Sequence, residues 1–202
     1  MANRVYSIVL NDDVVEAIDN TAYRLGMTRS ALINHILAQS VSLVTPEQRR
    51  RNIISAIRRE IDRDRLFVML DAGDNILTVK SQFKYKYNPT IKYSIVFTGK
   101  EGKGEIRIAM RTQNSTLIEG LDSFLHLWSG LEEKYPLPFK EGYFIAPGRY
   151  TRFFTLAKEN VNEEEIGDLL WQYINTFDTV MKDYFKNGSI ENAEKMYLKL
   201  LK

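Results

Sequence analysis

Two short stretches near the start of the chain carry side chains whose types and spacing could serve binding. Residues 4–10 alternate between two kinds of position, as a β-strand does, with one side formed by Tyr6, Ile8 and Leu10 and the other by Val5, Ser7 and Val9. Ser7 can donate or accept a hydrogen bond, whereas the valines can only pack, for example against a thymine methyl group. The second stretch is Thr28-Arg29-Ser30, where a helix start would offer free N–H groups to a phosphate and Arg29 would add a direct charge.

Three further patterns have both a functional and a structural interpretation. The aromatic and lysine residues between Phe83 and Tyr93 could stack bases, but the alternation puts rings and lysines on opposite faces, which is typical of a sheet with one buried face. The glycine-rich loop 99–104 lacks the spacing of a phosphate-binding loop and is explained by a hairpin turn. The third pattern is a set of arginines on one predicted helix, namely Arg49, Arg50, Arg51, Arg58, Arg59 and Arg63. These arginines could bind phosphates or form the solvated face of the helix, and nearby acidic residues favour the solvated face.

Neither a catalytic set nor a metal site is predicted. The chain has no cysteine and only two histidines, His35 and His126, each within a separate apolar helical pattern. Isolated histidines of this kind do not make a Ser–His–Asp or Cys–His arrangement, and a dedicated transition-metal site needs more soft or imidazole ligands. We therefore expect a protein that is not an enzyme and that requires no cofactor.

Composition is typical of a soluble globular protein. With 202 residues, 44% hydrophobic and 27% charged, the chain can form one large domain or a small and a medium one. No apolar run approaches the roughly 18 residues that a membrane span requires, and the N-terminus lacks the apolar stretch of a signal peptide. The absence of cysteine fits a reducing compartment, so we expect a cytoplasmic protein without a membrane partner.

The net charge of +2 is unevenly distributed. Residues 1–48 carry −2, residues 49–111 carry +8 and residues 112–202 carry −4. The basic middle of the chain is therefore the part that could face an anionic partner.

The N-terminal stretches are positioned by a predicted strand followed by two helices. Asn11 is suited to cap the first helix, and Gly26 to end it in the left-handed conformation. Thr28 is suited to cap the second helix, whose apolar stripe runs from Leu32 to Val41. A lone strand cannot satisfy its own backbone groups, and two such helices are too small to enclose a core. We therefore expect a second copy of the chain to complete this fold.

The order strand, helix, Gly26, Thr28-Arg29-Ser30, helix resembles the ribbon-helix-helix fold of the MetJ, Arc and CopG repressors, over about residues 3–44. In that family two chains pair their strands into an antiparallel ribbon that lies in the DNA major groove. The resemblance implies phosphate contacts from Thr28, Arg29 and Ser30, and base contacts from Arg4, Val5, Ser7 and Val9. Family members commonly carry longer polar or charged side chains at the outward strand positions, so base readout here would be sparse.

The rest of the chain predicts a larger α+β domain. A helix from Pro46 to about Arg63 precedes a buried strand at 66–70, a long strand at 76–87 and a hairpin of 91–98 with 105–111. A helix at about 116–134, a hairpin of 143–146 with 149–156, and two C-terminal helices follow. We expect a ribbon-helix-helix domain at 1–44, a basic connecting helix at 45–65 and an α+β domain with an antiparallel sheet and C-terminal helices at 66–202.

Three functions are compatible with this organisation. The first is a homodimeric, sequence-specific repressor that binds double-stranded DNA, with the larger domain serving further oligomerisation, partner binding or effector sensing. The second is an antitoxin or plasmid-maintenance accessory protein whose larger domain binds a protein partner. The third is a binder of single-stranded nucleic acid through the predicted sheet.

Overall fold

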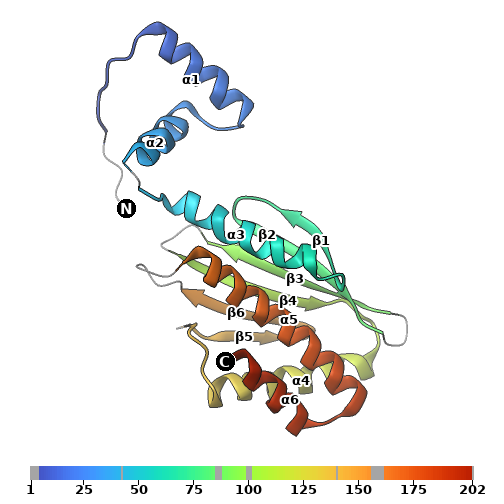
Figure 1. Cartoon of the computed structure of the whole chain (residues 1–202). Helices are drawn as coiled ribbons and strands as arrows, with labels where there is room; N and C mark the ends of the chain where they lie inside the picture. The colour runs from blue at the N-terminus through green and yellow to red at the C-terminus, as the bar shows by residue number, and fades with distance from the viewer. Residues whose placement is uncertain are drawn as a thin grey trace. The chain divides into compact units, whose positions relative to one another are not determined.

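The computed structural model describes residues 5–41, 43–84, 88–98, 102–139, 141–155 and 162–201. The chain forms two compact units, Met1–Thr45 and Pro46–Lys202 (Figure 1). The first unit contains helix α1 (Asp12–Arg24) and helix α2 (Arg29–Ser40). The second unit contains all of the sheet and the remaining helices, so the chain is a mixed α and β protein.

The helices of the first unit begin and end where the sequence predicts. The side chain of Asn11 accepts a hydrogen bond from the Val14 N–H at 3.1 Å, and that of Thr28 accepts one from the Ala31 N–H at 3.2 Å. Each cap satisfies a backbone donor that has no partner inside its own helix. Gly26 follows α1 with φ of +63°, a conformation that favours glycine. The predicted caps and the predicted helix end are confirmed.

The second unit is built on a six-stranded antiparallel sheet with strand order β1-β2-β3-β4-β6-β5. Its elements in chain order are α3 (Pro46–Arg63), β1 (Phe67–Ala72), β2 (Ile76–Gln82), β3 (Thr90–Phe97), β4 (Lys103–Met110), α4 (Ser115–Lys134), β5 (Tyr143–Ala146), β6 (Arg149–Thr155), α5 (Glu163–Asn187), α6 (Ile190–Tyr197) and the 3₁₀ turn η1 (Leu198–Leu201). Both predicted hairpins and the two predicted C-terminal helices are therefore present.

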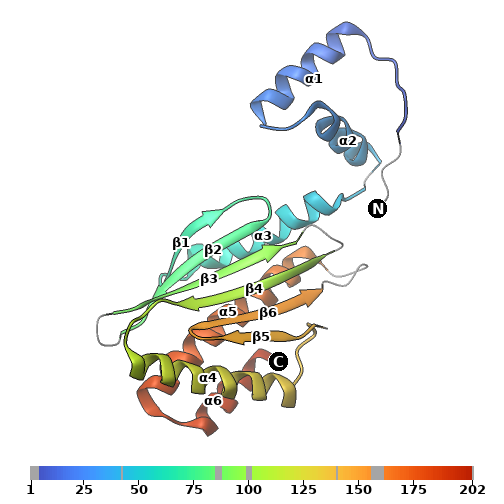
Figure 2. The same cartoon turned by 180° about the vertical axis from the view of Figure 1, so that it is seen from behind.

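Only one face of this sheet is part of the core. Side chains alternate between buried and more exposed positions along β4 and β6, as expected when one face of an antiparallel sheet packs and the other is solvated. Figure 2 shows strands β1 to β4 from the side opposite to α3 and α5. We call the side away from these helices the open face.

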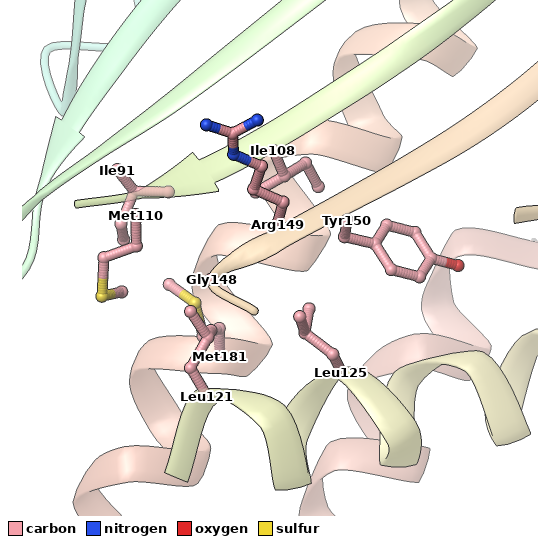
Figure 3. A pocket seen from close by; sticks show the side chains of 9 residues that line it. All are labelled: Ile91, Ile108, Met110, Leu121, Leu125, Gly148, Arg149, Tyr150 and Met181. Carbon is pink, nitrogen blue, oxygen red and sulfur yellow. The ribbon is translucent and has the colours of Figure 1, made fainter. Parts of the chain in front are cut away.

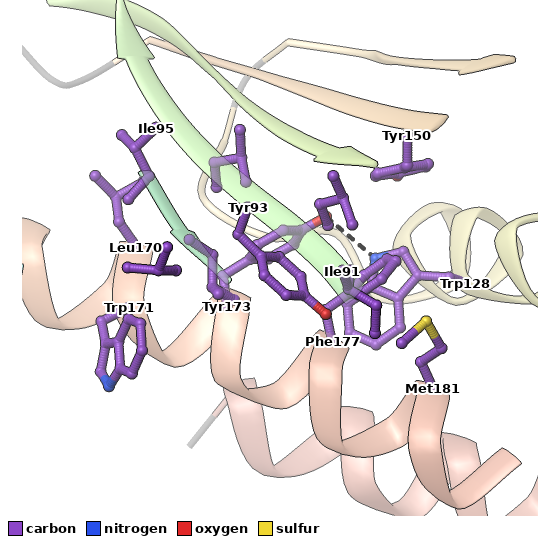
Figure 4. Close-up of a cluster of buried hydrophobic side chains, with 14 of the residues drawn as sticks. Ile91, Tyr93, Ile95, Trp128, Tyr150, Leu170, Trp171, Tyr173, Phe177 and Met181 are labelled. Carbon is purple, nitrogen blue, oxygen red and sulfur yellow. Dashed lines mark hydrogen bonds between the residues drawn. The ribbon is translucent and has the colours of Figure 1, made fainter. Parts of the chain in front are cut away.

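Aromatic side chains from three helices and several strands form the centre of the core (Figure 4). The ring of Trp128 on α4 lies 4.9 Å from that of Phe177 on α5 and 5.1 Å from that of Tyr197 on α6, both edge-on. The apolar sides of α4 and α5 are buried, apart from a half-buried Tyr184. Helix α5 approaches α3 so closely that a Cβ at Gly167 would lie 2.6 Å from that of Ala56.

Two strand predictions need correction. The strand predicted as buried at 66–70 is the edge strand β1. Phe67 is buried on the core face, but Val68, which is paired with Lys80 on the open face, and Leu70 are each about half exposed. A shift of register between Met69 and Asp71 marks a bulge there. The strand predicted over 76–87 ends at Gln82, and residues 85–87 lie outside the described residues.

Helix α3 is an integral part of the second unit. Ile53 and Ile57 are fully buried within its core, and Ile54 and Ile61 are nearly so. The apolar side of this basic helix therefore packs as core, and α3 is more than a connection between two parts.

Candidate nucleic-acid interface

Residues 5–10, which are predicted to pair with a second chain, lie in neither a helix nor a strand in this single chain. The side chains of the predicted outward side are nevertheless more exposed than those of the predicted apolar side. Val5 and Val9 are fully exposed, at 99% and 101%, whereas Tyr6, Ile8 and Leu10 are less so, at 78%, 59% and 38%. The segment thus has an apolar side that is partly turned toward the chain and an outward side that is free.

The first unit leaves most of its large apolar side chains uncovered. Among the described residues, thirteen of the twenty exposed large hydrophobic side chains belong to residues 1–45, although this unit is less than a quarter of the chain. Its buried apolar side chains are Ala22, Leu32 and Ala38. This unit therefore encloses little apolar surface of its own.

Three of the four predicted base-contacting residues are described, and all three are exposed. Val5, Ser7 and Val9 occupy alternate positions of the segment, and Ser7 makes no hydrogen bond to any other described residue. Arg4 lies outside the described residues.

The start of α2 is exposed, but its arginine already has a partner. Thr28 caps the helix, and Ser30 is exposed. Arg29 forms a bidentate ion pair with Asp19 of α1. Its Nε lies 2.5 Å from Oδ1, and its Nη2 contacts Oδ2. The hydrogen bond and the charge of Asp19 raise the pKa of Arg29. A phosphate at this helix end would therefore have to share the guanidinium with Asp19.

The arginines of α3 are mostly engaged with carboxylates. Five of the six have an acidic partner within 4 Å among the described residues, in the pairs Arg49–Glu163, Arg50–Glu47, Arg51–Asp74, Arg59–Glu164 and Arg63–Glu60. Three of these pairs join α3 to α5 or to the turn after β1. This pattern favours the structural interpretation of the basic helix over phosphate binding.

Two buried polar clusters hold the ionisable groups of the second unit that sequence reasoning missed. In the first, the Glu132 carboxylate accepts hydrogen bonds from Trp128 at 2.8 Å, Tyr173 at 2.6 Å and Tyr150 at 2.9 Å. Burial raises the pKa of Glu132, and these hydrogen bonds and the charge of Arg152 offset only part of that effect. Burial and the adjacent carboxylate also raise the pKa values of Tyr150 and Tyr173.

In the second cluster, the Asp178 carboxylate accepts hydrogen bonds from Ser81 at 2.5 Å, Tyr93 at 2.8 Å and Lys182 at 2.6 Å. Burial first, and Asp178 second, raise the pKa of Tyr93. The carboxylates of both clusters are almost fully buried. The clusters fix how α4 and α5 lie on the sheet.

A small pocket lies in the core of the second unit, and the described residues hold no group suited to a metal ion. The pocket between the sheet, α4 and α5 (Figure 3) has a volume of about 10 Å³, room for about one water molecule and far less than a typical ligand site. It is lined by Ile91, Ile108, Met110, Leu121, Leu125, Gly148, Arg149, Tyr150 and Met181. Among all the described residues, no group of three or more His, Asp or Glu side chains is placed to hold a metal ion. Over the same described ranges, no helix has both the length and the apolar character needed to cross a lipid bilayer.

Comparison of the chain with models of known protein families, with curated proteins and with solved structures found no match. The resemblance of residues 3–44 to ribbon-helix-helix proteins therefore depends on the residues themselves.

Proposed function

We propose that the protein is a dimeric, sequence-specific DNA-binding protein that acts as a transcriptional repressor. Two copies would pair residues 4–10 as an antiparallel ribbon, and the ribbon would enter the major groove. The observation that carries this proposal is the uncovered apolar surface of the first unit, which combines a strand-like segment without a partner and two capped helices.

A second copy would meet both needs of this unit at once. Its own segment 4–10 would supply hydrogen-bond partners for the backbone of the first. Its helices would cover apolar side chains such as Ile8, Leu25 and Leu37, which are all more than half exposed in the single chain. A two-fold dimer of this kind predicts an operator with two-fold or repeated half-sites.

The chemistry of the exposed residues supports sparse base readout combined with backbone contacts. Ser7 is the only outward position of the segment that can hydrogen-bond a base edge, and Val5 and Val9 can contact thymine methyl groups. The amides that begin α2 add a partial positive charge suited to phosphate.

Two measurements on the full chain test the proposal. Light scattering after size-exclusion chromatography gives the oligomeric state, which we expect to be a dimer. Gel-shift and footprinting assays on DNA upstream of the protein's own gene, with unrelated duplex of equal length as the control, give specificity and its salt dependence. A monomer that shows no salt-sensitive binding to either duplex would overturn the proposal.

A further inference from the structure

Three cations lie in one row across the open face of the sheet. Lys80 on β2 is paired with Lys92 on β3, Lys92 with Ala109 on β4, and Ala109 with Arg149 on β6. Strands are spaced by about 4.8 Å, so this row spans about 14 Å. None of the three cations forms an ion pair with another described residue. Lys92 and Arg149 are exposed, and Lys80 is half-buried.

The open face as a whole is basic. Its strand positions carry two carboxylates, Asp71 and Glu105, against five cations, which are Lys80, Lys92, Lys103, Arg107 and Arg149. Arg107 is in contact with Glu105, and Lys103 lies 3.2 Å from Glu141. The unpaired charge is therefore concentrated in the row that contains Lys80, Lys92 and Arg149.

Two exposed phenyl rings lie in the next two rows of the same face, the nearer in the row of Arg107 and Thr151 and the farther opposite Glu105. Phe144 on β5 is paired with Thr151 on β6, and Phe153 is two residues further along β6 on the same face. The two residues are therefore diagonal neighbours, whose backbone positions lie about 7–8 Å apart. Phe144 is 59% exposed and Phe153 is 37% exposed, and they are the only aromatic residues among the exposed large hydrophobic side chains described in the second unit.

From this arrangement we infer that the open face binds single-stranded nucleic acid. Unpaired bases stack on Phe144 and Phe153, and the phosphates of the same strand follow Arg149, Lys92 and Lys80. The site differs from the one considered from the sequence between Phe83 and Tyr93, because Phe83 and Tyr93 are buried in the core. It is also independent of the proposed ribbon, since every residue involved lies in the second unit.

A single strand fits this face better than a duplex does. Duplex DNA keeps its base faces stacked inside the helix, so it would contact the cations and leave both phenyl rings without a partner. A partner that is an acidic protein segment would likewise depend on the cations and gain little from ring stacking. The two phenyl rings therefore distinguish a single strand from a duplex or an acidic protein segment.

The test uses the full chain and a fluorescein-labelled oligothymidylate of about 12 nucleotides, a length within known site sizes, with fluorescence anisotropy as the readout. Oligouridylate of the same length and a thymine–adenine duplex are the other two probes. Two double variants are compared with the wild type. The aromatic variant combines Phe144→Ala with Phe153→Ala, and the sheet cation variant combines Lys80→Gln with Lys92→Gln. Lys186→Gln with Lys199→Gln removes the same charge from exposed positions on α5 and η1 and serves as the matched control.

We expect the aromatic variant to weaken binding of both single strands by at least about fivefold, the lower end of measured stacking contributions. The sheet cation variant should weaken binding more than its charge-matched control and reduce the salt dependence. Circular dichroism and thermal melting establish that each variant is folded. Equal binding by the aromatic variant and the wild type, or equal loss in the two charge variants, overturns the inference. Loss of duplex binding in the sheet cation variant, with no effect of the aromatic variant on any probe, also overturns it.

Discussion

The guanidinium of Arg152 on β6 lies against the carboxylate of Glu132 on α4, with Nε 2.9 Å from Oε2 and both side chains almost fully buried. Arg152 also donates hydrogen bonds to the carbonyls of Gly142 at 2.9 Å and Phe139 at 3.1 Å. The pair therefore joins α4, β6 and the segment that leads into β5.

Replacement of Arg152 by Met should strongly destabilise the protein. It would leave the Glu132 carboxylate buried without its charge partner, which typically costs about 3–5 kcal/mol. Urea unfolding measures the loss of unfolding free energy. Adding Glu132→Gln to this variant removes the isolated charge, so the double variant should regain part of the loss. A double variant whose losses simply add would contradict the coupling.

The pH dependence of stability should report on Glu132. Burial raises its pKa in the folded protein, so the folded state holds this proton more tightly than the unfolded chain does. Its contribution is then complete below the ordinary glutamate pKa of about 4.3 and is lost as the pH rises through the raised value. The unfolding free energy of the wild type minus that of Glu132→Gln should therefore fall as the pH rises above that range. The exposed Glu191→Gln variant is the control, and a rising difference would refute the assignment.

The contact between α3 and α5 should tolerate no side chain at Gly167. An added methyl group would meet Ala56 at 2.6 Å and the carbonyl oxygen of Ile53 at 3.1 Å, so Gly167→Ala should destabilise by about 1–3 kcal/mol. Gly130 on α4 has open space where its Cβ would be, and Gly130→Ala should stabilise by up to about 1 kcal/mol through helix propensity. Thermal melting compares the two, and an equal effect in both would count against a tight α3–α5 contact.

The two sides of the N-terminal segment should respond differently to a charge. Ile8→Asp places an unpaired carboxylate on the side proposed to pair with the second copy. The equilibrium dissociation constant of the dimer should therefore rise at least about a hundredfold. Val9→Asp places the same carboxylate on the outward side, so the dimer should persist while DNA binding is lost. Sedimentation velocity and gel-shift assays separate these outcomes, and identical behaviour of the two variants would rule out the alternation.

Base and phosphate contacts should be separable at Ser7 and Arg29. Ser7→Ala is expected to change which DNA sequences are preferred, whereas Arg29→Ala is expected to weaken binding to all duplexes alike and lower the salt slope by about 1. Asp19→Asn removes the charge that competes for Arg29 and should strengthen binding. Binding selections on randomised duplexes measure preference, and unchanged affinity and preference in all three variants would show that these residues do not contact DNA.

The sequence predicted most elements because their signals are local. The caps at Asn11 and Thr28 and the left-handed Gly26 all depend on residues a few positions apart. Whether a strand lies at the edge or the centre depends on its neighbours in space, and the apolar run at 66–70 is the same in either case. The edge position of β1 could not be predicted for this reason.

The buried charges were missed for a related reason. Glu132 follows Trp128 by one helical turn, and Asp178 follows the buried Ile174 by one helical turn, so both lie on the apolar sides of their helices. That placement was a signal for a buried carboxylate. Their partners, Arg152 and Ser81, come from distant parts of the chain, and only the folded sheet brings them together.

The bulge in β1 limits how copies of this chain can assemble. A bulge distorts the free edge of a sheet and makes it a poor template for a strand from another molecule. The opposite edge, β5, is only four residues long, which offers few hydrogen bonds for the same purpose. Both edges are thus protected against uncontrolled strand addition and aggregation, so the pairing proposed for residues 4–10 faces little competition from the sheet.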